Sequence, residues 1–463
     1  MLTVEKIGGT SMSKFHDVLK NIILGQKRDN SLYNRIFVVS AYANVTNWLL
    51  EHKKTGEPGI YQKFVKNEDY KQALQDLLKK LLDINKTFAD LGLELDVAEK
   101  FISDRINQAT SYLQSLKNVL ATGYVDKNSI LLAAREILAS IGEAHSAFNS
   151  VNILKNNGVN AIFVDLCGFD DPEYLTIDER IHKAFKNIDF STTMPIATGY
   201  TKGTEGIMRE FDRGYSEVTF SKIAVEVKAD EAVIHKEFHL SSADPNIVGV
   251  DKSIPVGYTN FNVADQLADI GMEAIHPKAS KPLEMAGIKI RVKNTFEPDH
   301  PGTLISKDYI CEKSKVEIIS GTDKVVAIEI HDPLMVGEVG FDHGIMEIFK
   351  KYNISYILKS TNANSITQVI WEKDLSDDLI NELKSRYYEV TVKPVAIVCA
   401  LGTNIAKPGI LAKAATTLAQ NNINIDCISQ SLKQVNMQFV ISRDNYKKAI
   451  IALNESLCLN NNY

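Results

Sequence analysis

The chain has few cysteines, and none of them is spaced to form a disulfide framework or a metal site. Its 463 residues contain five cysteines, an odd number scattered from residue 167 onward, with no C-x-x-C pair. This pattern favours free thiols in a reducing cytoplasm. The sequence also has no H-E-x-x-H motif and no cluster of cysteine and histidine, so we predict no metal ligands.

Long apolar runs and an excess of basic residues are also missing. No apolar run reaches the ~18 residues that a membrane span needs, and residues 1–5 lack the basic-then-apolar pattern of a leader. The formal net charge is -6 at pH 7, which argues against nucleic acid or an anionic membrane as the main partner. We therefore predict a cytoplasmic protein with neither partner.

The first strand-turn, V-E-K-I-G-G-T-S at residues 4–11, fits neither G-x-x-x-x-G-K-[ST] nor G-x-G-x-x-G. Its two glycines, Gly8 and Gly9, let the backbone approach a bulky anion, and a following helix would present unpaired N–H groups. Lys6 adds a positive charge, and Thr10 and Ser11 can donate hydrogen bonds or cap the helix. The turn predicts a phosphate site. A plain glycine turn ahead of a helix cap is the structural alternative.

Strands and helices alternate from residue 1 to about 300. Short apolar runs at 36–40, 161–165, 195–199 and 232–234 show little alternation, as in strands buried on both faces. Between about 60 and 145 the pattern is helical, with leucines at 74, 77, 78, 81 and 82. Proline and glycine at 298–302 predict a domain boundary. A length of 463 residues indicates about two to four domains.

The tail contains an internal repeat with an offset of 69 residues. V-A-I at 326–328 recurs at 395–397, Gly340 matches Gly409, and N-I at 353–354 matches 422–423. Each copy is expected to form a strand, a glycine turn, an amphipathic helix and an Asn-Ile strand. The repeat is either a duplicated dimerisation unit or a pair of ligand-sensing modules, in which exposed helix N–H groups suit an amino-acid carboxylate.

Two mid-chain segments carry charged residues that could bind a ligand. Glu143 closes S-I-G-E ahead of a helical run, where an acid is often a cap or dipole partner. Arg213 opens R-G-Y-S-E and presents a fork that can bind a carboxylate at two points. Glu217, four residues later, could instead form an i,i+4 pair with Arg213.

Taken in order, these segments resemble the aspartate kinase family over nearly the whole chain. Residues 6–11 are similar to its K-x-G-G-T-S signature, 38–47 to V-V-S-A…G-V-T-N with Asn44 in the glycine's place, and 140–143 to S-x-G-E. Residues 213–217 are similar to R-G-G-S-D, 243–245 to A-D-P and 275–277 to L-H-P. The repeated tail resembles tandem ACT domains.

The resemblance implies an α/β amino-acid-kinase fold over about 1–305, a sheet flanked by helices, with a helical insertion near 60–130. Two α+β ferredoxin-like ACT modules would follow, at 306–390 and 391–463, and the first strand of the tail, near 316–319, would complete the second. The implied reaction is phosphorylation of the side-chain carboxylate of L-aspartate by ATP with Mg²⁺. A homodimer or higher homo-oligomer and an amino-acid effector at the ACT modules are also implied.

The resemblance also assigns roles to residues. Lys6 would neutralise the moving phosphoryl group, Arg213 would hold the α-carboxylate of aspartate, and Glu143 its ammonium group; these three form the implied catalytic set. The substrate-binding set is Ser40, Thr46, Glu143, Arg213, Ser216 and Glu217. The nucleotide-binding set is Lys6, Gly8, Gly9, Thr10, Ser11, His235 and Lys236.

The chain departs from the family pattern in places. Residues 234–241 read I-H-K-E-F-H-L-S where the family commonly has W-T-D-V-D-G-V-Y, and this divergence is similar to the subgroup associated with ectoine synthesis. Ile357 stands where lysine-inhibited relatives carry an acid, although Asp426 keeps it in the second copy. An aliphatic side chain cannot pair with an ammonium ion, so we predict weak or absent inhibition by lysine.

Two alternative functions are consistent with the residues. One is another kinase of the same fold, acting on glutamate, carbamate or a nucleotide. The other is an amino-acid sensor whose kinase part has lost activity.

Overall fold

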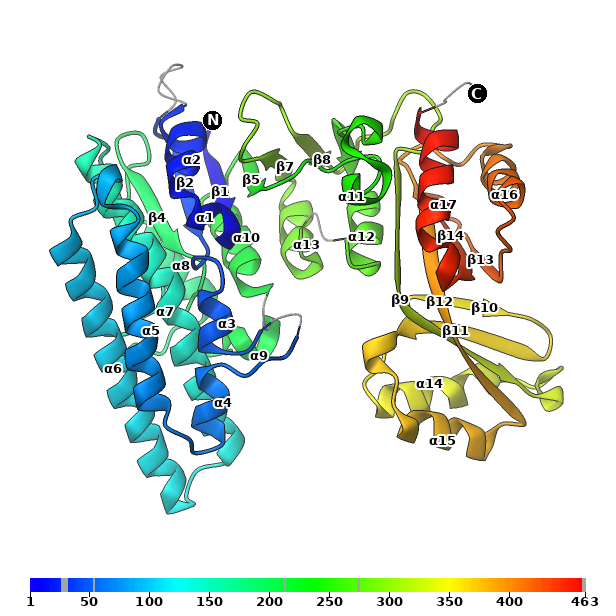
Figure 1. The fold of residues 1–463 in the computed structure, drawn as a ribbon, viewed down its shortest axis with the longest axis horizontal. Coiled ribbons are helices and arrows are strands. Elements are labelled where there is room, and N and C mark those ends of the chain that lie inside the picture. The colour runs from blue at the N-terminus through cyan, green and yellow to red at the C-terminus, as the bar shows by residue number, and fades with distance from the viewer. Residues whose placement is uncertain (26–31, 53–54, 212–213, 273–274, 460–463) are drawn as a thin grey trace. The chain divides into compact units, whose positions relative to one another are not determined.

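The computed structural model describes residues 1–25, 32–52, 55–211, 214–272 and 275–459 (Figure 1). The chain forms two compact units. The first comprises Met1–His239 and Ile275–Leu304, and the second comprises Leu240–Ala274 and Ile305–Tyr463. The two units are described separately below.

The first unit is built on a parallel sheet in the order β3-β4-β2-β1-β5-β7. These strands are β1 (Thr3–Ile7), β2 (Arg35–Val39), β3 (Ala161–Val164), β4 (Met194–Thr198), β5 (Glu231–Lys236) and β7 (Lys289–Asn294). β8 (Thr303–Ser306) lies at the boundary of the units. The four apolar runs predicted as strands are confirmed. All five residues of both β2 and β4 are buried, as expected for strands covered on both faces.

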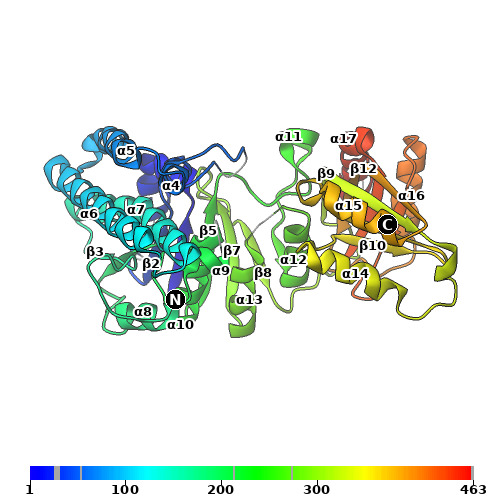
Figure 2. The ribbon, with the colours of Figure 1, turned by 90° about the horizontal axis from the view of Figure 1, so that it is seen from below.

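Helices cover both faces of this sheet, and Figure 2 shows α6 and α7 on one side and α8 and α10 on the other. The α-helices are α1 (Gly9–Ser13), α2 (Phe15–Asp17), α3 (Val45–Leu49), α4 (Ile60–Val65), α5 (Tyr70–Lys86), α6 (Leu95–Thr122), α7 (Lys127–Asn156), α8 (Ile177–Phe185), α9 (Ile207–Phe211), α10 (Tyr215–Glu226) and α13 (Pro277–Ala286). A π-helix, Val18–Ile23, follows α2.

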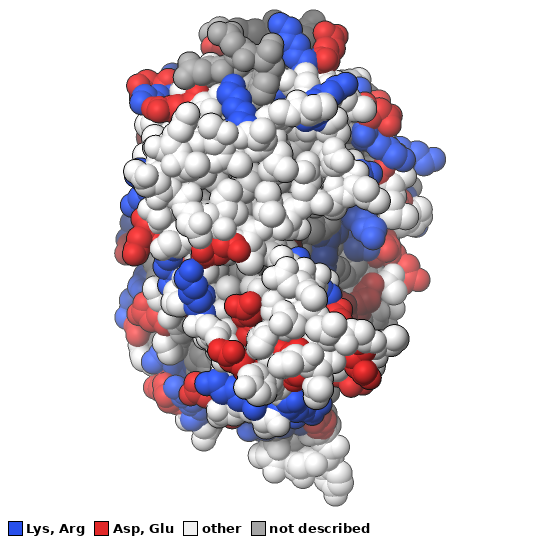
Figure 3. All heavy atoms as spheres, turned by 90° about the vertical axis from the view of Figure 1, so that its right-hand side faces the viewer, with Lys and Arg blue, Asp and Glu red and all other residues white. Residues whose placement is uncertain are grey.

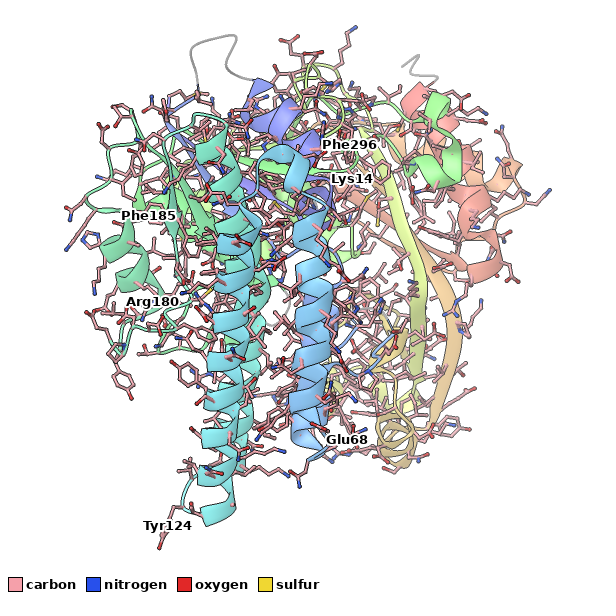
Figure 4. All side chains as sticks on the ribbon, turned by 60° about the vertical axis from the view of Figure 1, so that its left-hand side comes forward. Lys14, Glu68, Tyr124, Arg180, Phe185 and Phe296 are labelled. Carbon is pink, nitrogen blue, oxygen red and sulfur yellow. The ribbon has the colours of Figure 1, made fainter. Side chains whose placement is uncertain are left out.

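The long helices α5, α6 and α7 form the predicted helical block. Leu74, Leu77 and Leu81 of α5 are buried, so the leucine period marks the face that packs inward. The turn between α6 and α7 is at the far end of this block, where the Tyr124 side chain points away from the unit (Figure 4). One detail differs from prediction: Glu143 lies in the middle of α7, not near a helix start, so it is neither a cap nor a dipole partner.

The second unit has an antiparallel sheet in the order β10-β11-β9-β12-β14-β13. Its strands are β6 (Tyr258–Asn260), β9 (Ile318–His331), β10 (Leu358–Thr361), β11 (Ser365–Trp371), β12 (Glu389–Leu401), β13 (Cys427–Ser429) and β14 (Asn436–Ser442). Its α-helices are α11 (Pro245–Val248), α12 (Phe261–Asp269), α14 (Phe341–Lys351), α15 (Asp377–Arg386), α16 (Ile410–Gln420) and α17 (Tyr446–Leu453).

The two copies of the repeat have matching backbone geometry. Gly340 (φ 85°) and Gly409 (φ 94°) are the N-caps of α14 and α16, both in the left-handed region that favours glycine. Asn353 and Asn422 both have a φ of 55°. The two asparagines therefore lie in left-handed turns after the helices, and the prediction that they begin strands is wrong.

A single long strand links the parts of the second unit. The start of β9 pairs with the end of β12, and its later residues pair with both β11 and the start of β12. Val316 and Ile319 belong to the same apolar cluster as Ile410 and Leu418 of α16. No helix among the described residues is long and apolar enough to cross a membrane.

Candidate active site

Lys6 lies near the carboxyl end of the central strand β1. Its ammonium Nζ is 3.2 Å from Glu217 Oε1 on α10, and the backbone N–H of His276 donates to Glu217 Oε2 at 2.5 Å. Burial by itself raises the pKa of Glu217, but the charges of Lys6 and Lys236 outweigh it and lower the pKa to about 2. Glu217 is therefore ionised at neutral pH and holds the lysine at the strand end.

The Gly8-Gly9 turn follows directly and brings the backbone of two strand ends together. A Cβ added to Gly9 would lie 2.6 Å from the carbonyl oxygen of Ala41, just after β2. Such a contact is too short for any side chain, so glycine is required for this close approach. The turn thus presents backbone close to Lys6, as the phosphate-site prediction requires.

The two hydroxyl residues after the turn do not cap the helix. The N-cap of α1 is Gly8, with no side-chain cap bond, so the prediction of a Thr10 or Ser11 cap is wrong. Thr10 is exposed. Ser11 is fully buried, and its Oγ lies 3.2 Å from Thr295 Oγ1. Only Thr10 is therefore open to a ligand in this arrangement.

Glu143 and Ser216 come from helices on opposite faces of the sheet and meet beyond the end of β4. Ser216 Oγ donates to Glu143 Oε1 at 2.5 Å. A Cβ added to Gly199, the residue after β4, would lie 2.8 Å from Ser216 Cβ and 3.0 Å from Glu143 Oε2. Glycine at this strand end is what allows α7 and α10 to touch.

The Glu143 carboxyl is almost completely buried, at 1% exposure. Burial raises its pKa to about 8, although the Ser216 hydrogen bond and the charge of Lys6 oppose the rise. Its Oε2 atom has no hydrogen bond of good geometry among the described residues, although the nearby backbone N–H of Tyr200 also lowers the pKa. An unsatisfied buried carboxyl oxygen is costly, and a donor such as an ammonium group would satisfy it.

Ser40 and Thr46 lie on the segment after β2. The Ser40 N–H donates to the carbonyl of Ile7 at 3.1 Å, and its own carbonyl accepts from Ser146 Oγ on α7 at 2.8 Å. Thr46 lies in α3, whose N-cap Asn44 has a φ of 68°. Asparagine tolerates this left-handed conformation, which explains how it can stand in the glycine position of the family pattern.

His235 does not join Lys6. Successive side chains of a strand point to opposite faces, and the His235 ring lies on the face of Glu5, with Nε2 2.8 Å from Glu5 Oε2. Glu5 also accepts two bonds from Arg35, at 2.6 and 2.9 Å. The structure therefore contradicts a nucleotide contact through the His235 ring. Lys236 is on the Lys6 face, close enough to lower the pKa of Glu217.

Arg213, the predicted carboxylate clamp, lies outside the described residues, which resume at Gly214. A Cβ added to Gly214 would lie 2.8 Å from the ring of His276, so the chain after Arg213 passes close to the start of α13. The described residues contain no group of three or more His, Cys, Asp or Glu that could hold a metal ion.

Sequence reasoning missed two parts of the site. The His276 N–H that binds Glu217 lies in the I-H-P segment ahead of α13, which was matched to the family's L-H-P pattern without a role for its backbone. Gly199 could have been noticed in the sequence, because it directly follows the apolar run P-I-A-T. Its neighbours Glu143 and Ser216 could not, because they come from helices that only the fold brings together.

Comparison with known proteins identifies the family. A family model described as "Amino acid kinase family" matches residues 1–294, and one described as "ACT domain" matches residues 398–457. The chain is 48% identical to aspartate kinase Ask_Ect of Stutzerimonas stutzeri (strain A1501) over 466 residues, covering 99% of this chain and 97% of that protein. The chain belongs to the aspartate kinase family. Aspartokinase 2, chloroplastic, of Arabidopsis thaliana is 26% identical, over 98% of this chain and 84% of that protein.

Solved aspartate kinases share the fold. The Clostridium acetobutylicum enzyme matches with a TM-score of 0.73 at 22% identity, covering 98% of this chain and 100% of that one. E. coli aspartokinase III, solved in complex with aspartate and ADP, matches with a TM-score of 0.71 at 19% identity, over 99% and 100%. The predicted family, fold class and activity are confirmed: this aspartate kinase uses ATP to phosphorylate the side-chain carboxylate of aspartate.

Proposed function

We propose that Lys6 and the Gly8-Gly9 turn neutralise and align the phosphoryl group that passes from ATP to aspartate. A side-chain carboxylate is already ionised at neutral pH, with an ordinary pKa of about 3.9, so the reaction needs no general base. Catalysis then depends on alignment and on charge neutralisation. The Lys6–Glu217 pair supports this role, because it fixes an ammonium group at the strand end beside an amide-bearing turn.

Aspartate would be held by charges at both ends of its backbone. Glu143 would take the ammonium group, through the Oε2 atom that has no hydrogen bond of good geometry among the described residues, and Arg213 the α-carboxylate. Ser216 orients the Glu143 carboxyl by its hydrogen bond. Ser40 and Thr46 lie on the neighbouring segment and would donate hydrogen bonds to the substrate. The meeting of Glu143 and Ser216 at Gly199 is the observation that carries this proposal.

The set of nucleotide-binding residues that we propose is smaller than the set implied by the family resemblance. Lys6, Gly8, Gly9, Thr10 and Lys236 would face the phosphates, whereas His235 and Ser11 bind other protein groups in the structure. Mg²⁺ would enter with the nucleotide, held mainly by phosphate oxygens and water, since the described residues do not form a cluster of metal ligands.

A hydroxamate assay of phosphoryl transfer tests the clamp. We expect turnover with L-aspartate and little with L-glutamate. Arg213→Ala should weaken aspartate binding by about 2–5 kcal/mol and leave the KM for ATP unchanged. Arg386→Ala is a matched control, because the Arg386 side chain on α15 is 51% exposed. Equal aspartate affinity in R213A and R386A would remove Arg213 from the clamp.

We also propose that lysine is a weak inhibitor of this chain. E. coli aspartokinase III has been solved in complex with lysine and aspartate. Ile357 is buried in an apolar cluster of the second unit. Asp426 already pairs with Lys393, at 2.6 Å, and both line a cavity of about 540 Å³. Neither position offers an unpaired acid to an ammonium ion. Strong inhibition by sub-millimolar lysine in a steady-state assay would contradict this proposal.

A homodimer, the assembly implied by the family, would bury a surface of the second unit. Figure 3 shows a broad area with few charged side chains on that unit. Helix α16 carries a single charged residue, Lys413, in its 11 residues, and Leu411 on it is 38% exposed. Light scattering at micromolar protein concentration would show whether the enzyme is dimeric. The cytoplasmic location stays a prediction from the cysteine pattern.

A further inference from the structure

Glu136 lies on α7, about two helical turns before Glu143, and its carboxylate holds the segment that joins β4 to α9. Tyr200 Oη donates to Glu136 Oε2 at 2.6 Å, and the Met208 N–H donates to Oε1 at 2.8 Å. Gly206 in this segment has a φ of 75°, and a Cβ there would lie 3.1 Å from Glu136 Oε1. The segment is thus fitted closely around one carboxylate.

This segment adjoins the point where Glu143 and Ser216 meet. Tyr200 directly follows Gly199, and its ring packs edge-on against Tyr215, with centroids 5.9 Å apart. Both tyrosines are buried, at 3% and 2% exposure. Tyr215, which stands where the family pattern R-G-G-S-D has glycine, directly precedes Ser216. Contacts therefore run in a closed ring that begins and ends on α7, through Glu136, Tyr200, Tyr215, Ser216 and Glu143.

We propose that Glu136 is a positioning residue for the aspartate clamp. It does not touch the substrate. It fixes Tyr200, which supports Tyr215 and so keeps the Ser216 hydroxyl on the Glu143 carboxyl. The hydrogen bond from the Ser216 hydroxyl orients the Glu143 carboxyl, and an oriented carboxyl reduces the cost of ordering the clamp around aspartate. The inference rests on the proposed role of Glu143.

Two conservative variants test it. Glu136→Gln weakens the acceptor, and Tyr200→Phe removes the donor of the same bond while keeping the ring. Loss of one such bond should raise the KM for aspartate roughly tenfold, with the KM for ATP unchanged. The double variant should be no worse than either single one, because both changes remove one interaction. Tyr112→Phe, which removes a hydroxyl bonded to the Phe169 carbonyl, should leave both KM values unchanged.

Glu143→Gln separates this inference from the clamp itself. If E143Q leaves the KM for aspartate unchanged, the clamp role fails, and the positioning role fails with it. If E143Q raises that KM while E136Q and Y200F do not, only the positioning role fails. The positioning role would also fail if the KM for aspartate in the E136Q/Y200F double variant rose by the product of the two single effects. It would fail as well if the KM for ATP rose as much as the KM for aspartate. The melting temperature of each variant separates unfolding from a loss of aspartate affinity.

Discussion

Lys6 and Glu5 are neighbours in β1, but their side chains lie on opposite faces of the sheet in ion pairs of different kinds. Glu5 accepts two hydrogen bonds from Arg35 and one from His235, and Arg35 also donates to the carbonyls of Ile22 and Ile23. Lys6 pairs with Glu217, with its Nζ atom 3.2 Å from Glu217 Oε1. An ammonium group has three donors, so the pairing with Glu217 leaves capacity for a phosphate.

The comparison separates a pair that stabilises the fold from one that serves the reaction. In the Glu5 network each charge is buried and its hydrogen-bonding capacity is largely used, and removing a partner leaves an uncompensated charge. On the Lys6 face the cation is fixed by a single acid at the edge where the glycine turn and the clamp residues converge. Glu5 and Lys6 are adjacent in β1, so we expect a variant of Glu5 to lose stability and a variant of Lys6 to lose activity.

The largest effect is expected at Lys6. Lys6→Met removes the charge that would neutralise the phosphoryl group, and we expect kcat to fall by roughly 10³-fold or more, with aspartate binding largely kept. Lys183→Met is the matched control, since Lys183 pairs with Glu173 on the surface of the same unit. Near-normal turnover by K6M in a coupled ADP assay would remove Lys6 from catalysis.

The second effect should appear in stability and not in turnover. Glu5→Gln leaves Arg35 buried without a counter-charge, and we expect a loss of about 3–5 kcal/mol in the free energy of unfolding, measured in urea. The folded fraction should keep its kcat. Glu231→Gln, in the more exposed pair with Arg291, should cost less. If E5Q and E231Q destabilise the protein equally, burial does not distinguish the two pairs.

Glu5 also predicts a pH effect of definite sign. Burial by itself raises the pKa of Glu5, but Arg35 and His235 hold it far below its ordinary value. A depressed pKa contributes stability above the unfolded value, and this is lost as pH falls through the folded one. Wild-type protein should therefore lose more stability than E5Q between about pH 5 and pH 2. Parallel urea curves for the two proteins over this range would contradict the expectation.

A smaller pH effect is expected at Glu143, which reaches the site from the other face of the sheet. With its pKa raised to about 8, the carboxyl of the free enzyme is mostly protonated at pH 7 and cannot pair with an ammonium group. The kcat/KM for aspartate should therefore rise with pH between 6 and 8, by up to roughly tenfold per unit. In Glu143→Gln this limb of the profile should be absent. A profile unchanged by E143Q would assign the titration to another group.

The smallest effect is expected at His235. Its ring is buried against Glu5, and burial lowers its pKa despite that acid, so the ring is neutral at pH 7. His235→Gln should cost about 1–2 kcal/mol of stability and leave the KM for ATP within about twofold of wild type, whereas Lys236→Met should raise it. A large rise in the KM for ATP in H235Q would restore the nucleotide role that the fold contradicts.

The local features of the chain were readable from its sequence because short-range physics fixes them. Four apolar runs became parallel strands, and the leucine period became the buried face of α5. Gly340 and Gly409 marked two equivalent helix starts. The place of Lys6 near the end of a strand was also predictable, because the Gly8-Gly9 pair ends the strand two residues after the lysine.

The tertiary structure alone decided which side chains meet. The Glu136–Tyr200–Tyr215 contacts join α7, the segment after β4 and α10. Residues 240–274 group with the tail without any local pattern that indicates it. The side of the sheet on which His235 lies follows from the register of β5 with β1, in which His235 pairs with Ile7, two residues from Glu5. Sequence determines which groups are available, through residue type and backbone preference. Long-range packing determines their partners, because burying a charged group without a partner is costly.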